Sequence, residues 1–134
     1  MRTLNRIHSP VHQVRIFQNE IFWPTLQSIY DVKLDLRRLD DDEAEILRVL
    51  LDRRSLVDID QTLLRQRELA VQKEEKQAEL ERKWNLIHTG CNFIALLLNE
   101  DIDEKAEPLT PHEVYRTLAI GEPMADRTFE VKFS

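Results

Sequence analysis

The side chains best suited to chemistry in this chain of 134 residues are four histidines and a single cysteine. His8 and His12 have the four-residue spacing of a helical metal pair, but Pro10 between them places His8 ahead of any helix. We interpret both as surface residues. The sequence contains no cysteine pair, no His-Glu-x-x-His motif and no Glu-x-x-His motif. We therefore expect neither a metal site nor a cofactor.

Arg82 and His88 form a second candidate. The segment Arg82-Lys-Trp-Asn-Leu-Ile-His88 resembles the Arg-x(4 to 6)-His motif of HEPN ribonucleases, which are small helical proteins that build an RNase site across a dimer interface. This resemblance implies a dimeric ribonuclease in which these two residues act on RNA. It is confined to two residues, and the same spacing occurs twice more near the N-terminus. We keep it as an alternative and expect no catalytic residues.

Glycine content and net charge exclude other functions. Only two glycines are present, neither in a glycine-rich run, so the standard phosphate-cradling loops are absent. The formal net charge of −6 argues against a protein that binds nucleic acid by neutralising phosphates. A further alternative is a small helical subunit of a nucleoprotein complex, which would place four basic residues on the phosphate backbone: Arg65, Arg67, Lys73 and Lys76.

Cys91 bears on the redox state of the compartment in which the protein is expected to act. As the sole cysteine it forms no intramolecular disulfide, and no basic residue flanks it to stabilise a thiolate, so we interpret it as a core residue. A lone cysteine fits a reducing compartment. No run approaches the ~20 apolar residues that span a bilayer. The expected location is the cytoplasm.

A long helix over about residues 56–99 is the element around which the others are organised. Steps of three and four residues from Leu56 to Leu98 pass ten apolar residues at thirteen positions. Between Thr25 and Thr89 the chain has neither glycine nor proline, which favours helix throughout. Gly90 interrupts the apolar end, where a glycine is tolerated if another helix crosses closely or the helix kinks.

The residues before the long helix predict two further helices. Tyr30 to Leu36 fits a helix or a strand, with helix favoured, and Asp40 to Asp42 is interpreted as a joint. A helix follows over about 43–54. We predict a break over residues 52–60 that lets this helix pack antiparallel to the long one, although a single helix over 43–99 is an alternative.

Both ends of the chain carry boundary signals. Ser9-Pro10 predicts a helix start and Pro24 predicts its stop or a kink. The clearest start is Thr110-Pro111-His112-Glu113, with a short helix to Ile120 that Gly121 closes. Phe129, Val131 and Phe133 alternate with polar residues, which is typical of a strand.

These observations predict an all-α, elongated helical hairpin or bundle over residues 1–121, followed by a tail or edge strand over residues 122–134. The function expected is a non-enzymatic interaction or assembly module, binding a second copy of itself or a larger complex, with no membrane and no small-molecule substrate. The predicted partner-binding residues are those of the apolar stripe and the tail: Leu80, Trp84, Ile87, Cys91, Ile94, Leu98, Phe129, Val131 and Phe133.

Overall fold

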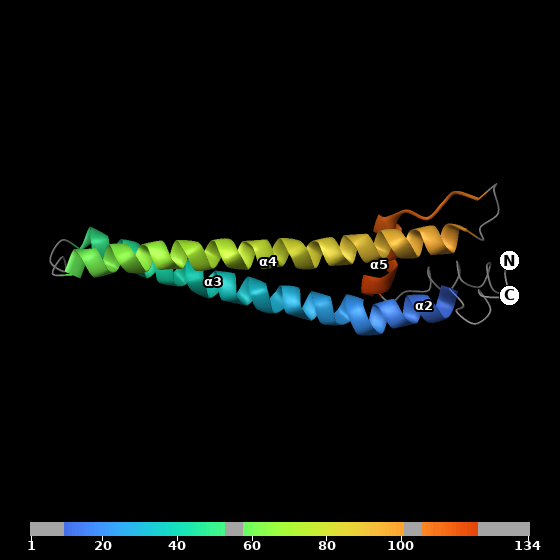
Figure 1. Ribbon diagram of the computed structural model, residues 1–134, viewed down its shortest axis with the longest axis horizontal. Coiled ribbons are helices and arrows are strands. Elements are labelled where there is room, and N and C mark those ends of the chain that lie inside the picture. The colour runs from blue at the N-terminus through green and yellow to red at the C-terminus, as the bar shows by residue number, and fades with distance from the viewer. Residues whose placement is uncertain (1–9, 53–57, 101–105, 121–134) are drawn as a thin grey trace. The chain divides into compact units, whose positions relative to one another are not determined.

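The computed structural model describes residues 10–52, 58–100 and 106–120, and all regular structure within these ranges is helical. Figure 1 shows the elements, which are α2 (Pro10–Ile16), the π-helix η1 (Phe17–Phe22), α3 (Trp23–Leu51), α4 (Ile59–Asn99) and α5 (Pro111–Ile120). The predicted all-α class and the long central helix are confirmed. In the described part of the chain, no helix combines the length and the apolar character needed to cross a bilayer. The predicted tail strand lies outside the described residues.

A π-helical turn precedes Pro24. The N–H of Trp23 donates to the carbonyl of Gln18, one residue further back than in an α-helix. Proline supplies no N–H, and in an α-helix its ring crowds the carbonyl four residues earlier. Here Pro24 is the second residue of α3, directly after the wider turn. The predicted stop at Pro24 is therefore wrong, because the helical backbone continues through η1 into α3.

The contacts of the chain divide it into two compact units. The first, here called the hairpin unit, comprises residues 27–83. The second, here called the terminal unit, joins residues 1–26 to residues 84–134 and is described over 10–26, 84–100 and 106–120. Each unit is considered by itself.

In the hairpin unit, α3 and α4 lie side by side and run antiparallel (Figure 1). The apolar side chains buried between them come from both helices: Ile29, Val32 and Ile46 from α3, and Leu69 from α4. Ion pairs join the two helices in opposite chain order: Asp35 with Lys76 at 3.2 Å, Asp40 with Lys73 at 2.7 Å, and Asp42 with Arg65 at 4.0 Å. The predicted antiparallel pair is confirmed, and so is the break, because α3 ends at Leu51 and α4 begins at Ile59.

Asp40 to Asp42 do not form a joint. They lie inside the continuous helix α3, and the region from Tyr30 to Leu36 is helical as well. Aspartate favours helix caps because its side chain competes for local backbone N–H groups. Here Asp40 and Asp42 are instead paired with cations of α4. The predicted joint is therefore wrong, and the ion pairs of Asp40 and Asp42 with α4 are tertiary contacts that the local sequence does not reveal.

The apolar stripe predicted along α4 is displaced in the hairpin unit. Ile59 and Leu63 are more than 40% exposed, whereas Leu69, which lies outside the predicted stripe, is buried. A strict repeat of 3.5 residues drifts about 20° per heptad against a straight α-helix. Over several heptads, a stripe defined at the C-terminal end of α4 therefore turns away from the face that packs at its N-terminal end.

Lys73 lies on the packed face of α4 and supports the antiparallel register. Its Nζ lies 2.7 Å from an oxygen of Asp40 and 3.4 Å from one of Glu43. The hydrogen bond that Lys73 donates to the Asp40 carboxylate is the main cause that raises the pKa of Lys73 above its usual 10.5. Because the folded pKa is the higher one, this stabilisation is complete below pH 10.5 and is lost as the pH rises further.

We expect Lys73→Glu to lower the melting temperature of the protein, because it places a third carboxylate against Asp40 and Glu43. The measurement is thermal unfolding followed by circular dichroism at low salt. Arg67→Glu makes the same charge change at an exposed position of the same helix and should shift the melting temperature less. Equal shifts in the two variants would contradict a specific role for Lys73.

Candidate docking surface

The residues of the predicted stripe that lie in the terminal unit are buried within this chain. Ile87, Cys91, Ile94 and Leu98 are at most 2% exposed. Trp84 is half-buried in the terminal unit, and Leu80 is half-buried in the hairpin unit. The tail residues Phe129, Val131 and Phe133 lie outside the described residues. The stripe of α4 therefore packs against helices of its own chain, and the surface of the terminal unit is formed by other side chains.

An aromatic cluster forms the centre of the terminal unit. Phe22 is fully buried, and its ring centroid lies 5.2 Å from that of Trp23 and 5.6 Å from that of Tyr115, both with edge-to-face geometry. The Tyr115 ring also contacts Trp84, at 6.5 Å. Edge-to-face pairs at these distances are favourable beyond the area that they bury. The cluster joins η1, α4 and α5 into one core.

Hydrogen bonds fix the start of α5. The hydroxyl of Thr110 accepts a bond from the backbone N–H of Glu113 at 3.2 Å, so the predicted cap and helix start are confirmed. The Asn99 side chain at the end of α4 donates to the Leu109 carbonyl at 2.9 Å and accepts from the Leu109 N–H at 2.7 Å. These two hydrogen bonds hold Leu109, which precedes α5, against the C-terminal end of α4.

Gly90 allows a close approach between α4 and η1. A Cβ placed on Gly90 would lie 3.2 Å from Cδ1 of Phe17 and closer still to Cε1 and Cζ of the same ring. Phe17 is buried and its ring contacts Phe22 at a centroid distance of 6.2 Å, so the ring has a neighbour that opposes its displacement. The predicted close crossing at Gly90 is confirmed, and the crossing element is η1.

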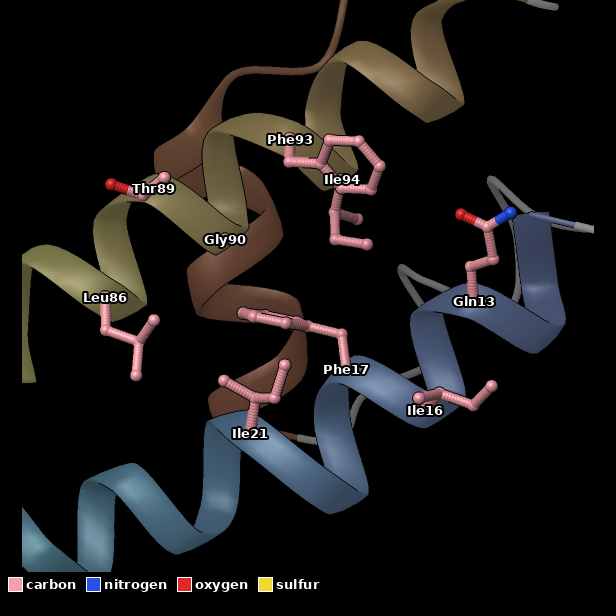
Figure 2. Close-up of a pocket in the computed structure, with 9 residues that line it drawn as sticks. All are labelled: Gln13, Ile16, Phe17, Ile21, Leu86, Thr89, Gly90, Phe93 and Ile94. Carbon is pink, nitrogen blue, oxygen red and sulfur yellow. The ribbon is translucent and has the colours of Figure 1, made fainter.

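An open groove runs over this crossing (Figure 2). Its volume is about 430 Å³, and no charged side chain lines it. The lining comes from α2 and η1 on one side and from α4 on the other: Gln13, Ile16, Phe17, Ile21, Leu86, Thr89, Gly90, Phe93 and Ile94. Figure 2 shows Ile21 and Leu86 pointing toward one another from η1 and α4. The groove is therefore a candidate binding site for an apolar side chain or for a helix.

Large apolar side chains surround the groove. Phe93 is 57% exposed and Leu86 is 49% exposed, while Ile16 and Ile21 are each more than one third exposed. Leu96, one helical turn beyond Phe93, is 60% exposed. These five side chains, Ile16, Ile21, Leu86, Phe93 and Leu96, are here called the apolar face. They are the surface of the terminal unit best suited to contact another protein.

Charge is absent from this part of α4. Residues 84–99 contain no Asp, Glu, Lys or Arg, although Asn85, Leu86, His88, Thr89, Asn92, Phe93 and Leu96 are exposed. The preceding part of the same helix, residues 59–83, carries charged side chains at eight of its 17 exposed positions. Solvated helix faces normally carry charge, and the cores of protein interfaces are depleted in it. The loss of charged side chains from Trp84 onward therefore favours a binding surface on this segment of α4.

Sequence reasoning missed the apolar face, although a signal for it was present. The stripe that was followed contains Ile87, Cys91 and Ile94, and a second set of apolar residues on the same helix segment contains Leu86, Phe93 and Leu96. A helix that is apolar on two faces and lacks charge is covered on more than one side. Only the structure decides which of the two stripes is buried within the chain.

A second pocket lies on the side of α4 next to α5. It has a volume of about 550 Å³ and is lined by Trp84, His88, Cys91, Pro111, His112 and Tyr115. Burial raises the pKa of the Cys91 thiol to about 11, so it is protonated at neutral pH. The His88 ring stacks on Trp84 at 6.1 Å. Among the described residues, no three His, Cys, Asp or Glu side chains are placed to hold a metal ion.

Comparison with protein-family models, with curated proteins and with solved structures found no match for this chain.

Proposed function

We propose that this protein is a non-enzymatic interaction module that docks onto another protein through the apolar face of its terminal unit. The observation that carries the proposal is the set of exposed apolar side chains around the groove, on a helix segment without charge. In the proposed mechanism, a helix of the partner lies in the groove and covers Phe93 and Leu86.

The size of the apolar face supports this proposal. The five residues are 37–60% exposed, so together they expose an apolar surface on the order of a few hundred Å². The largest apolar patch on a typical monomer is about 300–600 Å² and is often functional. Isolated apolar residues on a surface need no explanation, but a contiguous set around a groove favours a binding role.

Two alternative functions receive less support. A nucleoprotein subunit would use Arg65, Arg67, Lys73 and Lys76 on phosphates. Three of these four, Arg65, Lys73 and Lys76, are paired with acidic residues of α3. Binding phosphate would require breaking those pairs. A ribonuclease would need His88 as an acid or base, and the neighbour that contacts its ring is the aromatic side chain of Trp84.

We propose the cytoplasm as the site of action. The support is the single, buried cysteine, which fits a reducing compartment.

Site-specific photo-crosslinking in the native cells tests the proposed function. A photoreactive phenylalanine analogue at position 93 should give crosslinked protein adducts, because Phe93 is exposed at the centre of the apolar face. The same analogue at Val71, which is 50% exposed in the hairpin unit, is the matched control and should give none of those adducts.

Specificity is tested with a second substitution. Thr89 lies on the groove lining, and Thr89→Arg places a long charged side chain where the partner would lie. The adducts formed at position 93 should disappear in the Thr89→Arg variant. Adducts that persist, or a position 93 that gives none, would contradict the proposed function.

A further inference from the structure

We infer that the partner of the apolar face is a second copy of the same chain, docked symmetrically so that Phe93 of each copy fills the groove of the other. This inference rests on the proposed function and names its partner. The geometry supports it because the apolar face carries both a protruding side chain and the recess that could receive one.

The protruding side chain and the recess lie within one helical turn of each other. Phe93 stands at the rim of the groove with 57% of its surface exposed, and the Phe17 ring, packed closely against Gly90, lines the groove between α4 and η1. Figure 2 shows Phe93 on α4 and the Phe17 ring between α4 and η1. In an isologous interface residue i meets residue j and residue j meets residue i. In a symmetric dimer, Phe93 of each copy can therefore enter the groove of the other copy, which gives two equivalent contacts.

The charge distribution favours a second copy over a charged partner. The chain carries a net charge of −6, so two copies would repel through most of their surfaces. The segments that form the groove are an exception. Residues 84–99 carry no charge, and residues 10–26 carry only Arg15 and Glu20, which are exposed and have opposite signs. Two such faces meet without repulsion, whereas a basic partner would bind the acidic parts of the chain.

The area available also fits a dimer of ordinary size. A standard interface buries about 800 Å² per partner, of which somewhat more than half is apolar. The apolar face supplies an apolar surface on the order of a few hundred Å², and polar residues that line the same groove, Gln13 and Thr89, supply the type of rim that such interfaces have.

Light scattering after size exclusion tests this inference on the full chain. The parent protein should have twice the chain mass of 15.9 kDa, and Phe93→Asp should have the mass of a single chain at the same concentration. Thr89→Arg should also be monomeric. Val71→Asp, with the same charge change at a similarly exposed residue outside the terminal unit, should remain dimeric. Circular dichroism should show the same helix content in all four proteins, because none of the substituted side chains is buried.

The outcomes separate this inference from the proposed function. A parent dimer that Phe93→Asp and Thr89→Arg dissociate supports both. A dimer that these substitutions leave intact, or a monomeric parent, overturns the second copy as partner. If the parent is monomeric but position 93 still crosslinks specifically to a different protein, the docking function stands with a foreign partner. If no specific adduct forms either, both are overturned.

Discussion

Replacing Gly90 with alanine should destabilise the terminal unit by about 1–3 kcal/mol, which is the usual cost of overfilling a packed core. Helix propensity by itself predicts the opposite sign, because alanine stabilises a helix interior by up to ~1 kcal/mol relative to glycine. The added Cβ would collide with the Phe17 ring, so we expect the steric term to be the larger one. Both tryptophans, Trp23 and Trp84, lie in the terminal unit, so denaturant unfolding followed by tryptophan fluorescence reports on this unit.

A double-mutant cycle identifies the cause. Phe17→Leu removes the ring atoms Cε1 and Cζ that approach Gly90 most closely. In that background Gly90→Ala should be neutral or stabilising, and the difference between the two backgrounds measures the coupling between positions 17 and 90. If Gly90→Ala stabilises the parent protein, the close crossing of α4 and η1 is contradicted.

Phe22→Ala should cause the largest loss of stability of any single truncation considered, about 3–5 kcal/mol. Phe22 is fully buried and contacts Phe17, Trp23 and Tyr115, so its removal leaves a cavity at the centre of the terminal unit. Since natural domains are stable by only about 5–15 kcal/mol, such a loss takes up a large share of the total. The measurement is the free energy of unfolding from denaturant titration, again followed by fluorescence.

Trp23→Ala is the matched control for Phe22. The two residues are adjacent in sequence and in contact, but Trp23 is 42% exposed, so its truncation leaves a surface depression rather than a cavity. The loss of stability should be clearly smaller, and Trp84 remains as the fluorophore. Equal losses for the two substitutions would show that Phe22 is not the centre of the core.

Local signals in the sequence were sufficient where the structure depends on neighbouring residues. The start of α5 is an example, because Thr110 caps a helix whose first residue is Pro111, and both features act within four residues. The separation of α3 and α4 is another, since polar residues interrupt the apolar pattern between Leu51 and Ile59. The burial of Cys91 followed from its position on an apolar stripe.

Predictions failed where the structure does not follow the usual preference of a single residue type. Asp40 and Asp42 were read as a joint because aspartate favours caps, yet the helix continues and cations from α4 pair with them. Pro24 was predicted to stop or kink the helix. The stop does not occur, because a π-helical turn just before Pro24 keeps the backbone helical.

The sequence by itself therefore determined that this protein is all-α, with a long apolar-ended helix and a capped helix near residue 110. The tertiary structure decided which side of that long helix is a surface. Residues 84–99 are apolar on two faces, and periodicity alone treats these faces as equivalent. The face with Ile87, Cys91 and Ile94 is buried within the chain, and the missing side chain of Gly90 lets the Phe17 ring of η1 approach α4 closely. Leu86, Phe93 and Leu96 remain exposed, and they carry the proposed docking site.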